Sequence, residues 1–259
     1  MPAESTPPPA SSVIDALGFG NGVVAAAAAA LAAAASRAMD LRPDPLVLLL
    51  AAAGTLVIYG VDRLRDVSRD RITAPARTAF VERHRRGMLA LSALAGVLAL
   101  AAGWGAGWRV VAVAGGVAAL GLAHRRLKHR IAAKPIYLVL AWTGVAVALP
   151  LARDPGGRHA AWAALVIALS VWANVILSNL KDAEGAAAYF GARRARRVAF
   201  AACAAGTALA LAGPGGVPRL VPLPVAMALA VIGFRPSERY AAWFVDGALA
   251  LGGALALWP

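Results

Sequence analysis

Long apolar stretches, separated by short polar ones, run along almost the whole chain of 259 residues. A stretch of about 20 apolar residues crosses a bilayer as a helix, and shorter ones can cross when tilted or packed inside a bundle. The pattern predicts nine such helices, at residues 13–35, 45–62, 87–104, 108–123, 135–152, 160–180, 198–213, 217–234 and 240–257. We therefore expect an all-α polytopic membrane helix bundle with about nine transmembrane helices.

Composition agrees with this pattern, because 60% of the residues are hydrophobic and only 15% are charged, far from the balance of a soluble domain. Alanine and glycine are frequent in the apolar stretches, and small residues let membrane helices approach closely. Residues 1–12 are Pro-rich and polar, so we expect a disordered tail there. Residues 13–259 are expected to form a single transmembrane domain.

The basic residues indicate an orientation. Most of the 26 lysines and arginines fall in the loops after the second, fourth, sixth and eighth predicted helices. Since Lys and Arg concentrate in cytoplasmic loops, these loops and the N-terminus are predicted to be cytoplasmic, in a protein of the bacterial inner membrane. The net charge of +13 then reflects topology. It predicts anionic lipids as neighbours and argues against nucleic-acid binding.

Three aspartates stand where the second apolar stretch ends. Asp62, Asp66 and Asp70 follow i, i+4, i+8 spacing, which places them on one face of a helix. Like charges at this spacing repel, and a helix C-terminus is itself partly negative, so the row predicts a positive partner. The alternative is a solvated helix with ordinary ion pairs to nearby arginines, namely Arg63, Arg65 and Arg69.

A second polar row stands at the end of the sixth apolar stretch. Asn174, Ser178 and Asp182 repeat the same spacing. The two stretches are separated by four predicted helices, so both polar ends are expected on the same face of the bundle, around one cavity. The alternative for Asn174, Ser178 and the adjacent Asn179 is hydrogen bonding to neighbouring helices.

Together these features resemble the UbiA-type polyprenyltransferase superfamily, which has nine membrane helices and aspartate-rich motifs after helices two and six. The first motif of that family, N-x-x-x-D-x-x-x-D, is similar to Asp62, Asp66 and Asp70, with Asp in place of Asn. The second, D-x-x-x-D, is similar to Ser178–Asp182, with Ser in place of the first Asp. The basic stretch 127–142, LKHRIAAKPIYLVLAW, resembles the segment leading into the fifth helix of the family.

The resemblance implies a Mg²⁺-dependent prenyltransferase of the EC 2.5.1 class that uses an isoprenoid diphosphate. Its catalytic residues would be Asp66 and Asp182, and its metal ligands would include these two with Asp62 and Asp70. Arg77, which resembles the basic residue after the first motif, would bind the diphosphate together with Lys128 and Lys181. Glu184 is a possible stand-in for the carboxylate missing at Ser178. Mg²⁺ uses few carboxylates plus phosphate oxygens, so this reduced set suffices in principle.

The same resemblance implies a substrate pocket inside the bundle, lined by Tyr59, Asn174, Ser178, Tyr137 and Trp142. Aromatic ring faces there would shield the allylic cation. The acceptor would be a small hydrophobic or aromatic molecule, or another lipid precursor, and membrane lipids would surround the protein. The alternative for the aromatic residues is ordinary packing in the core or at the lipid interface.

Two other functions compete with the enzyme. The first is a non-catalytic UbiA-like lipid-binding or scaffold protein, in which carboxylates paired with arginines would be expected. The second is a transporter, which would show interrupted helices and intramembrane charges. Asp246 is the one such charge inside a predicted helix. It is either a buried partner of a basic residue or the end of a helix.

Overall fold

The computed structural model describes residues 13–127, 133–181 and 191–258, and these residues form helices and loops only. The first half contains α1 (Val13–Phe19), α2 (Gly22–Ala38), α3 (Pro45–Arg65), α4 (Val67–Thr73), α5 (Pro75–Arg83), α6 (Arg85–Ala106), α7 (Trp108–Leu127), α8 (Ala133–Thr143), the π-helix η1 (Gly144–Ala148) and α9 (Leu149–Arg153). The second half contains α10 (Ala160–Lys181), α12 (Ala192–Ala212), the 3₁₀-helix η2 (Val217–Leu220), α13 (Pro222–Ile232), α14 (Glu238–Tyr240), the π-helix η3 (Ala241–Val245) and α15 (Asp246–Leu255). The expected all-α bundle is confirmed.

Every apolar stretch that the sequence predicted as a membrane helix lies on one helix or on consecutive helices. In the described residues, five helical segments are long and apolar enough to cross a membrane: Pro45–Arg65, Arg85–Ala106, Pro135–Arg153, Ala160–Lys181 and Ala192–Ala212. The pair α1 and α2 makes a sixth if it is taken as one bent span. The segments Trp108–Gly121 and Val217–Ile232 are apolar but shorter. An integral membrane protein follows, whereas the number nine stays a prediction.

Several of the predicted helices are not regular throughout, and the first and the last show this most clearly. The first bends by 58° between α1 and α2, where Asn21 has a left-handed backbone with φ of 67°. Asparagine tolerates this conformation better than most residues do. The last predicted helix, 240–257, contains the π-helical turn η3 ahead of Asp246. Such turns break the regular hydrogen-bond ladder and are frequent at functional sites.

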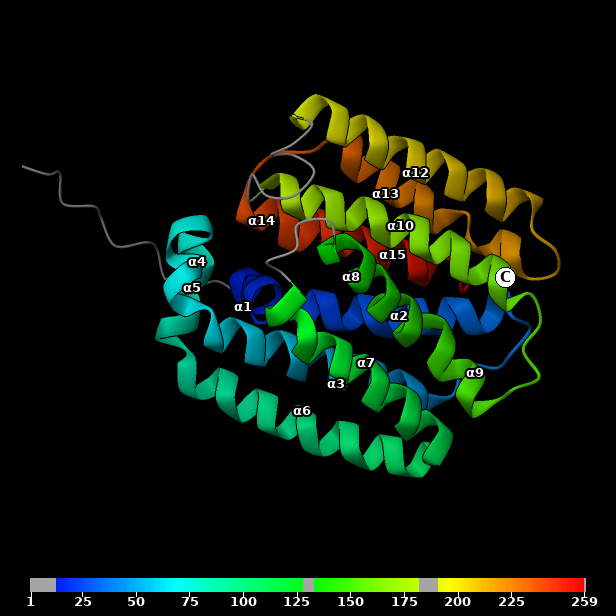
Figure 1. The fold of residues 1–259 in the computed structure, drawn as a ribbon, viewed down its shortest axis with the longest axis horizontal. Helices are drawn as coiled ribbons and strands as arrows, with labels where there is room; N and C mark the ends of the chain where they lie inside the picture. The colour runs from blue at the N-terminus through cyan, green and yellow to red at the C-terminus, as the bar shows by residue number, and fades with distance from the viewer. Residues whose placement is uncertain (1–12, 128–132, 182–190, 259) are drawn as a thin grey trace, which may run out of the picture.

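Small side chains allow the helices of the core to pack closely. Helix α2 lies in the middle of the bundle, and Ala27, Ala28 and Leu31 on it are fully buried (Figure 1). It contacts both α3 and α15. A Cβ atom added to Gly253 of α15 would lie 3.0 Å from the Cβ of Ala30 on α2. Since little space separates these helices, their attraction comes largely from close packing.

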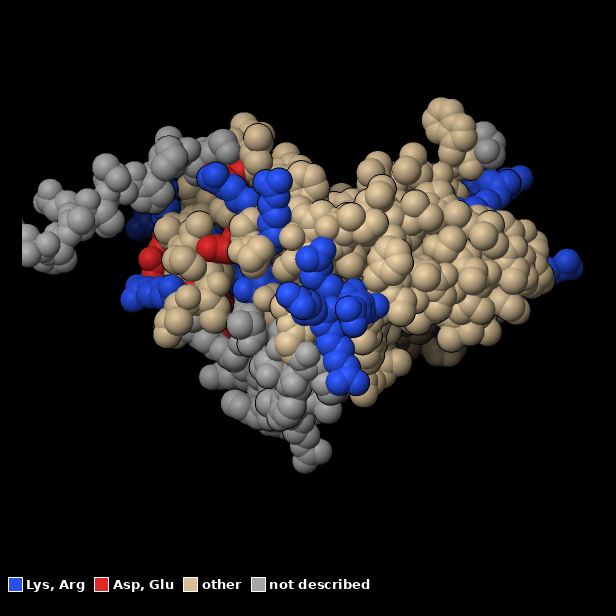
Figure 2. Space-filling model, turned by 90° about the horizontal axis from the view of Figure 1, so that it is seen from above, with Lys and Arg blue, Asp and Glu red and all other residues tan. Residues whose placement is uncertain are grey.

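The helices run roughly parallel to the long axis, so the loops gather at two ends (Figure 1). Helices α4, α5 and α14 and the C-terminus of α10 lie at one end, and the loops before α3 and after α9 lie at the other. Figure 2 shows charged side chains at the first end and as far as the middle of this face, a belt without charged side chains beyond them, and a few basic side chains at the far end. A belt of this kind matches a membrane-spanning region. Which end faces the cytoplasm stays a prediction.

The aspartate row does not lie on a single helix, as the spacing predicted. Helix α3 ends at Arg65 and α4 begins at Val67, with Asp66 between them at φ −96° and ψ 13°. The i−4 hydrogen bonds nevertheless continue, from the Asp66 N–H to the Asp62 carbonyl (3.0 Å) and from the Asp70 N–H to the Asp66 carbonyl (2.9 Å). Repulsion between carboxylates at i, i+4 weakens a straight continuation, which gives a physical reason for the break.

Candidate functional site

Two arginines bind the carboxylate of Asp70. Its Oδ2 accepts a hydrogen bond from Nη2 of Arg77 at 2.7 Å, and Nη1 of Arg63 lies 3.6 Å from the same oxygen. The three side chains are at most 22% exposed and come from the last turn of α3, from α4 and from the first turns of α5. The positive partner that the aspartate row predicted is thus present at Asp70, in the form of arginines. Arg63 was missing from the predicted site.

The carboxylates of Asp62 and Asp66 are half-buried at the same end of the bundle. The carboxylate of Asp62 makes no hydrogen bond or ion pair within the described residues. Among the residues that the structure describes, no group of three Asp, Glu, His or Cys side chains lies close enough to hold a metal ion. The predicted ligand Asp182 lies outside the described residues. The described donor set therefore fits Mg²⁺ only in the mode that uses one or two carboxylates together with phosphate oxygens.

Asn174 of α10 binds the start of α15. Its Nδ2 donates to the carbonyl oxygen of Val245 (3.2 Å) and to Oδ1 of Asp246 (3.1 Å). Val245 is the last residue of the π-helix η3. The Asn174 side-chain amide therefore binds a backbone carbonyl where the regular α-helical hydrogen bonding is interrupted. The interhelical hydrogen bonding that the alternative predicted for Asn174 is present. Asp246, described above as either a buried partner or a helix end, is the first residue of α15 and binds an amide.

Charged groups from four helices converge around Asp246. Arg63, Arg77 and Lys181 lie within electrostatic range of its carboxylate. Asp246, Arg63 and Asp62 are likewise within range of the Tyr59 hydroxyl. Lys181 is the last residue of α10, and Arg77 is near the start of α5. The structure thus brings Asn174 of the second polar row and the charged groups around the first to one place, and adds Asp246 and Arg63.

Aromatic side chains border this cluster on its membrane side. Nε1 of Trp142 donates to the Tyr59 hydroxyl at 3.3 Å, and the two rings meet edge to face with centroids 6.4 Å apart. Tyr137, one helical turn before Trp142 on α8, is also buried. These three residues were predicted for the pocket. Ser178 is half-buried on α10, one turn after Asn174, and the predicted Lys128 lies outside the described residues.

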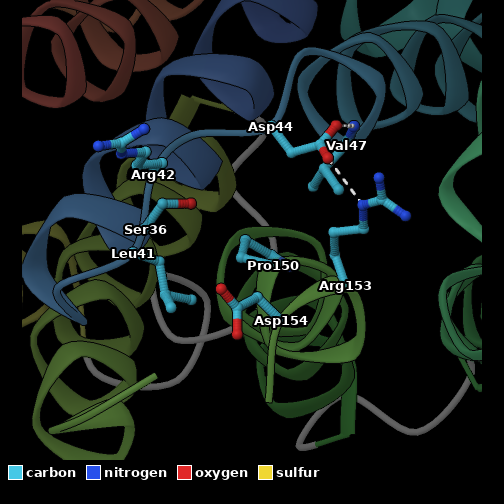
Figure 3. A pocket seen from close by; sticks show the side chains of 8 residues that line it. All are labelled: Ser36, Leu41, Arg42, Asp44, Val47, Pro150, Arg153 and Asp154. Carbon is cyan, nitrogen blue, oxygen red and sulfur yellow. Dashed lines mark hydrogen bonds and ion pairs between the residues drawn. The ribbon is translucent and has the colours of Figure 1, made fainter. Parts of the chain in front are cut away.

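A second polar cluster lies at the opposite end of the bundle, in a small recess between α3 and α9 (Figure 3). Asp44 accepts hydrogen bonds from the backbone N–H of Leu46 (2.8 Å) and from Nε of Arg153 (2.7 Å). Burial raises the pKa of Asp44, but these hydrogen bonds outweigh it and bring that pKa below its ordinary value of 3.8. The carboxylate caps the N-terminus of α3 and ties it to α9. It is a structural contact far from the cluster around Asp246.

Comparison with known proteins supports the fold. No family model matches the sequence, and no curated protein matches it. A solved structure of digeranylgeranylglyceryl phosphate synthase, a UbiA-type membrane prenyltransferase, superposes with a TM-score of 0.52 at 14% identity. The match covers 93% of this chain and 98% of that one. At this identity the likeness concerns the architecture, and the chain has the UbiA-like fold that its helices and aspartate motifs indicated.

Proposed function

We propose that the chain is a membrane prenyltransferase that transfers a prenyl group from an isoprenoid diphosphate to a hydrophobic acceptor. The observation that carries the proposal is the convergence of Arg63, Arg77 and Lys181 at the polar end of an apolar bundle. Together with Mg²⁺ on the aspartates, three cations at one place favour a ligand with several negative charges, and a diphosphate on an apolar chain matches both the cluster and the bundle. The solved relative in fold is itself a prenyltransferase.

In this proposal the diphosphate lies between the arginines and the half-buried aspartates. Asp62 and Asp66, with Asp182, would hold Mg²⁺ jointly with the phosphate oxygens. Bound there, the ion would neutralise charge that develops on the leaving group. Asp70 has a different part: it orients the Arg77 guanidinium, which donates hydrogen bonds to the diphosphate as the bond from the prenyl carbon to oxygen breaks.

The prenyl chain would extend from this cluster into the apolar bundle. When the carbon–oxygen bond breaks, the allylic carbon becomes positive and the diphosphate takes the electron pair. The ring faces of Tyr59 and Trp142 can stabilise that cation while excluding water. The acceptor then bonds to the carbon and loses a proton. Asn174 holds Asp246 at the pocket wall, where its negative charge keeps the surrounding cations oriented.

The test is Mg²⁺-dependent binding of geranylgeranyl diphosphate to the purified protein in detergent. We expect Asp66→Ala to abolish turnover and weaken Mg²⁺-dependent binding at least tenfold, since it removes a charged ligand of the ion. Asp154→Ala is the matched control, because Asp154 is an exposed aspartate at the opposite end that bonds only its own turn. Full activity of Asp66→Ala would refute the site.

A non-catalytic lipid-binding or scaffold protein is the second candidate function. It is favoured by one specific observation, the pairing of Asp70 with two arginines. A scaffold predicts that folded protein binds geranylgeranyl diphosphate no better with Mg²⁺ than without it. The binding experiment therefore separates the two functions directly.

A further inference from the structure

Helix α5 lacks a capping side chain of its own. Its N-cap residue is Ala74, and Pro75 at the first helical position has no N–H. The next two backbone N–H groups, of Ala76 and Arg77, are bound by a residue far away in sequence. Ala76 donates to Oε1 of Glu238 at 3.0 Å, and Arg77 donates to Oε2 at 2.8 Å. One carboxylate thus satisfies both N–H groups at the positive end of the helix.

The turn that carries Glu238 is itself anchored. The next residue, Arg239, makes a two-pronged ion pair with Asp15 of α1, with both N–O distances at 3.1 Å. Ser237 caps the following turn by accepting from the Tyr240 N–H at 3.1 Å. Asp15 is only 8% exposed. Glu238 is therefore presented to α5 from a turn that is capped locally and tied to α1.

The opposite side of α5 has a weaker anchor. Phe80 packs against Phe19 of α1 with ring centroids 6.0 Å apart, and Val81 is buried. The short helices α4 and α5 stand at one end of the bundle (Figure 1), where α5 contacts α1, α3 and α6 and α4 contacts α3. Helices of this length are unstable alone and depend on their contacts.

We propose that Glu238 is a positioning residue that docks α5 over the diphosphate site and so places Arg77. The proposal rests on the function proposed above. The geometry connects the two ends of Arg77: its backbone N–H binds Glu238, and its guanidinium binds Asp70. Fixing the backbone limits where the guanidinium can reach. The last segment of the chain thereby controls donor binding without touching the donor.

The experiment compares Glu238→Gln with Glu82→Gln in the full-length protein. Glu82 is the matched control, a glutamate on α5 itself that pairs with Arg71 at the surface (2.6 Å). Hydrogen–deuterium exchange over residues 75–83 reports docking whether or not the protein is an enzyme. We expect Glu238→Gln to speed this exchange about tenfold, because a neutral amide holds the helix terminus less strongly. Glu82→Gln should change it little.

Donor binding then tests the positioning role. We expect Glu238→Gln to raise the Kd for geranylgeranyl diphosphate about tenfold, with the acceptor KM unchanged. In an Arg77→Ala background the same change should add no further loss, since Glu238 acts through Arg77. Additive losses, or faster exchange with an unchanged donor Kd, would overturn the proposal. Unchanged exchange would overturn it as well.

Failure of the proposed function would give a different set of results from failure of the positioning role. If wild-type protein binds no isoprenoid diphosphate, the prenyltransferase proposal and the donor role of Glu238 both fall. The exchange data would still show whether Glu238 docks α5. A docked helix without donor binding would point to the scaffold.

Discussion

Replacing Asn174 by leucine should destabilise the bundle by about 2–4 kcal/mol. The amide makes two hydrogen bonds, one to the neutral Val245 carbonyl and one to the Asp246 carboxylate. A neutral bond contributes about 1 kcal/mol and a bond to a charged group about 1.5–3 kcal/mol. Within the described residues, Asn174 is the one group that donates a hydrogen bond to Asp246. Leucine would leave that carboxylate buried without a donor.

A competing argument predicts a smaller loss of stability for Asn174→Leu. Hydrogen bonds between membrane helices average only about 0.6 kcal/mol, so two ordinary ones would contribute about 1.2 kcal/mol. For a chain of this size, about 2–4 °C in Tm corresponds to each kcal/mol. The carboxylate argument thus predicts a fall of about 5–15 °C, and the ordinary-bond argument about 2–5 °C. Thermal unfolding in detergent, followed by circular dichroism, distinguishes them.

The control is Asn179→Leu, on the same helix. Asn179 is as buried as Asn174, at 3% and 7% exposure, but its Nδ2 has no hydrogen-bond partner among the described residues. Removing an unsatisfied buried amide should leave Tm unchanged or raise it. If Asn174→Leu lowers Tm by no more than Asn179→Leu does, the reasoning about Asp246 is refuted.

Two further predictions concern the second motif and the opposite end. Ser178→Asp should restore the carboxylate that the resemblance lacks and strengthen Mg²⁺-dependent binding of geranylgeranyl diphosphate several-fold, whereas Ser178→Ala should not; a magnesium titration of binding measures both. Asp44→Ala should lower the free energy of unfolding by about 1–2 kcal/mol at pH 7, since it removes the α3 cap and the Arg153 partner. Because folding lowers the pKa of Asp44, its stabilisation is present above the unfolded pKa and is lost as pH falls through the folded one. The Tm difference between wild type and Asp44→Ala should therefore shrink below about pH 4, and an unchanged difference would contradict the assignment.

Much of the fold could be predicted from the sequence because its signals are local. Hydropathy marks the apolar helices, and the pair Asp44–Pro45, which the prediction did not use, is a local helix-start signal found at the beginning of α3. Two polar rows four helices apart predicted that both would lie at one end of the bundle, and Asn174 of the second row does lie near the charged cluster that follows the first. The break at Asp66 could not be predicted from spacing, because a one-residue interruption leaves the i, i+4 pattern intact.

The missed residues depend on tertiary contacts. Glu238 lies in the last loop, and nothing in its local pattern indicates α5 as its partner. Asp246 was noticed as an intramembrane charge, but its partner Asn174 is 72 residues away. Arg63 was assigned to a local pair, whereas it also lies beside Asp70, across the break between α3 and α4. In each case the charged residue can be read from the sequence, but its partner depends on how the bundle folds.

The pairing of Asp70 with arginines is compatible with both an enzyme and a scaffold. A scaffold needs its carboxylates neutralised, and Asp70 meets that need. A scaffold does not by itself account for a third cation, Lys181, near the buried Asp246 at the same place. A bound diphosphate would account for these cations, because its charge is opposite to theirs. With Asp70 holding Arg77, the proposed function assigns Mg²⁺ to Asp62 and Asp66, together with Asp182. Asp66→Ala should therefore impair donor binding through the metal, whereas Asp70→Asn should impair it through Arg77 even without Mg²⁺.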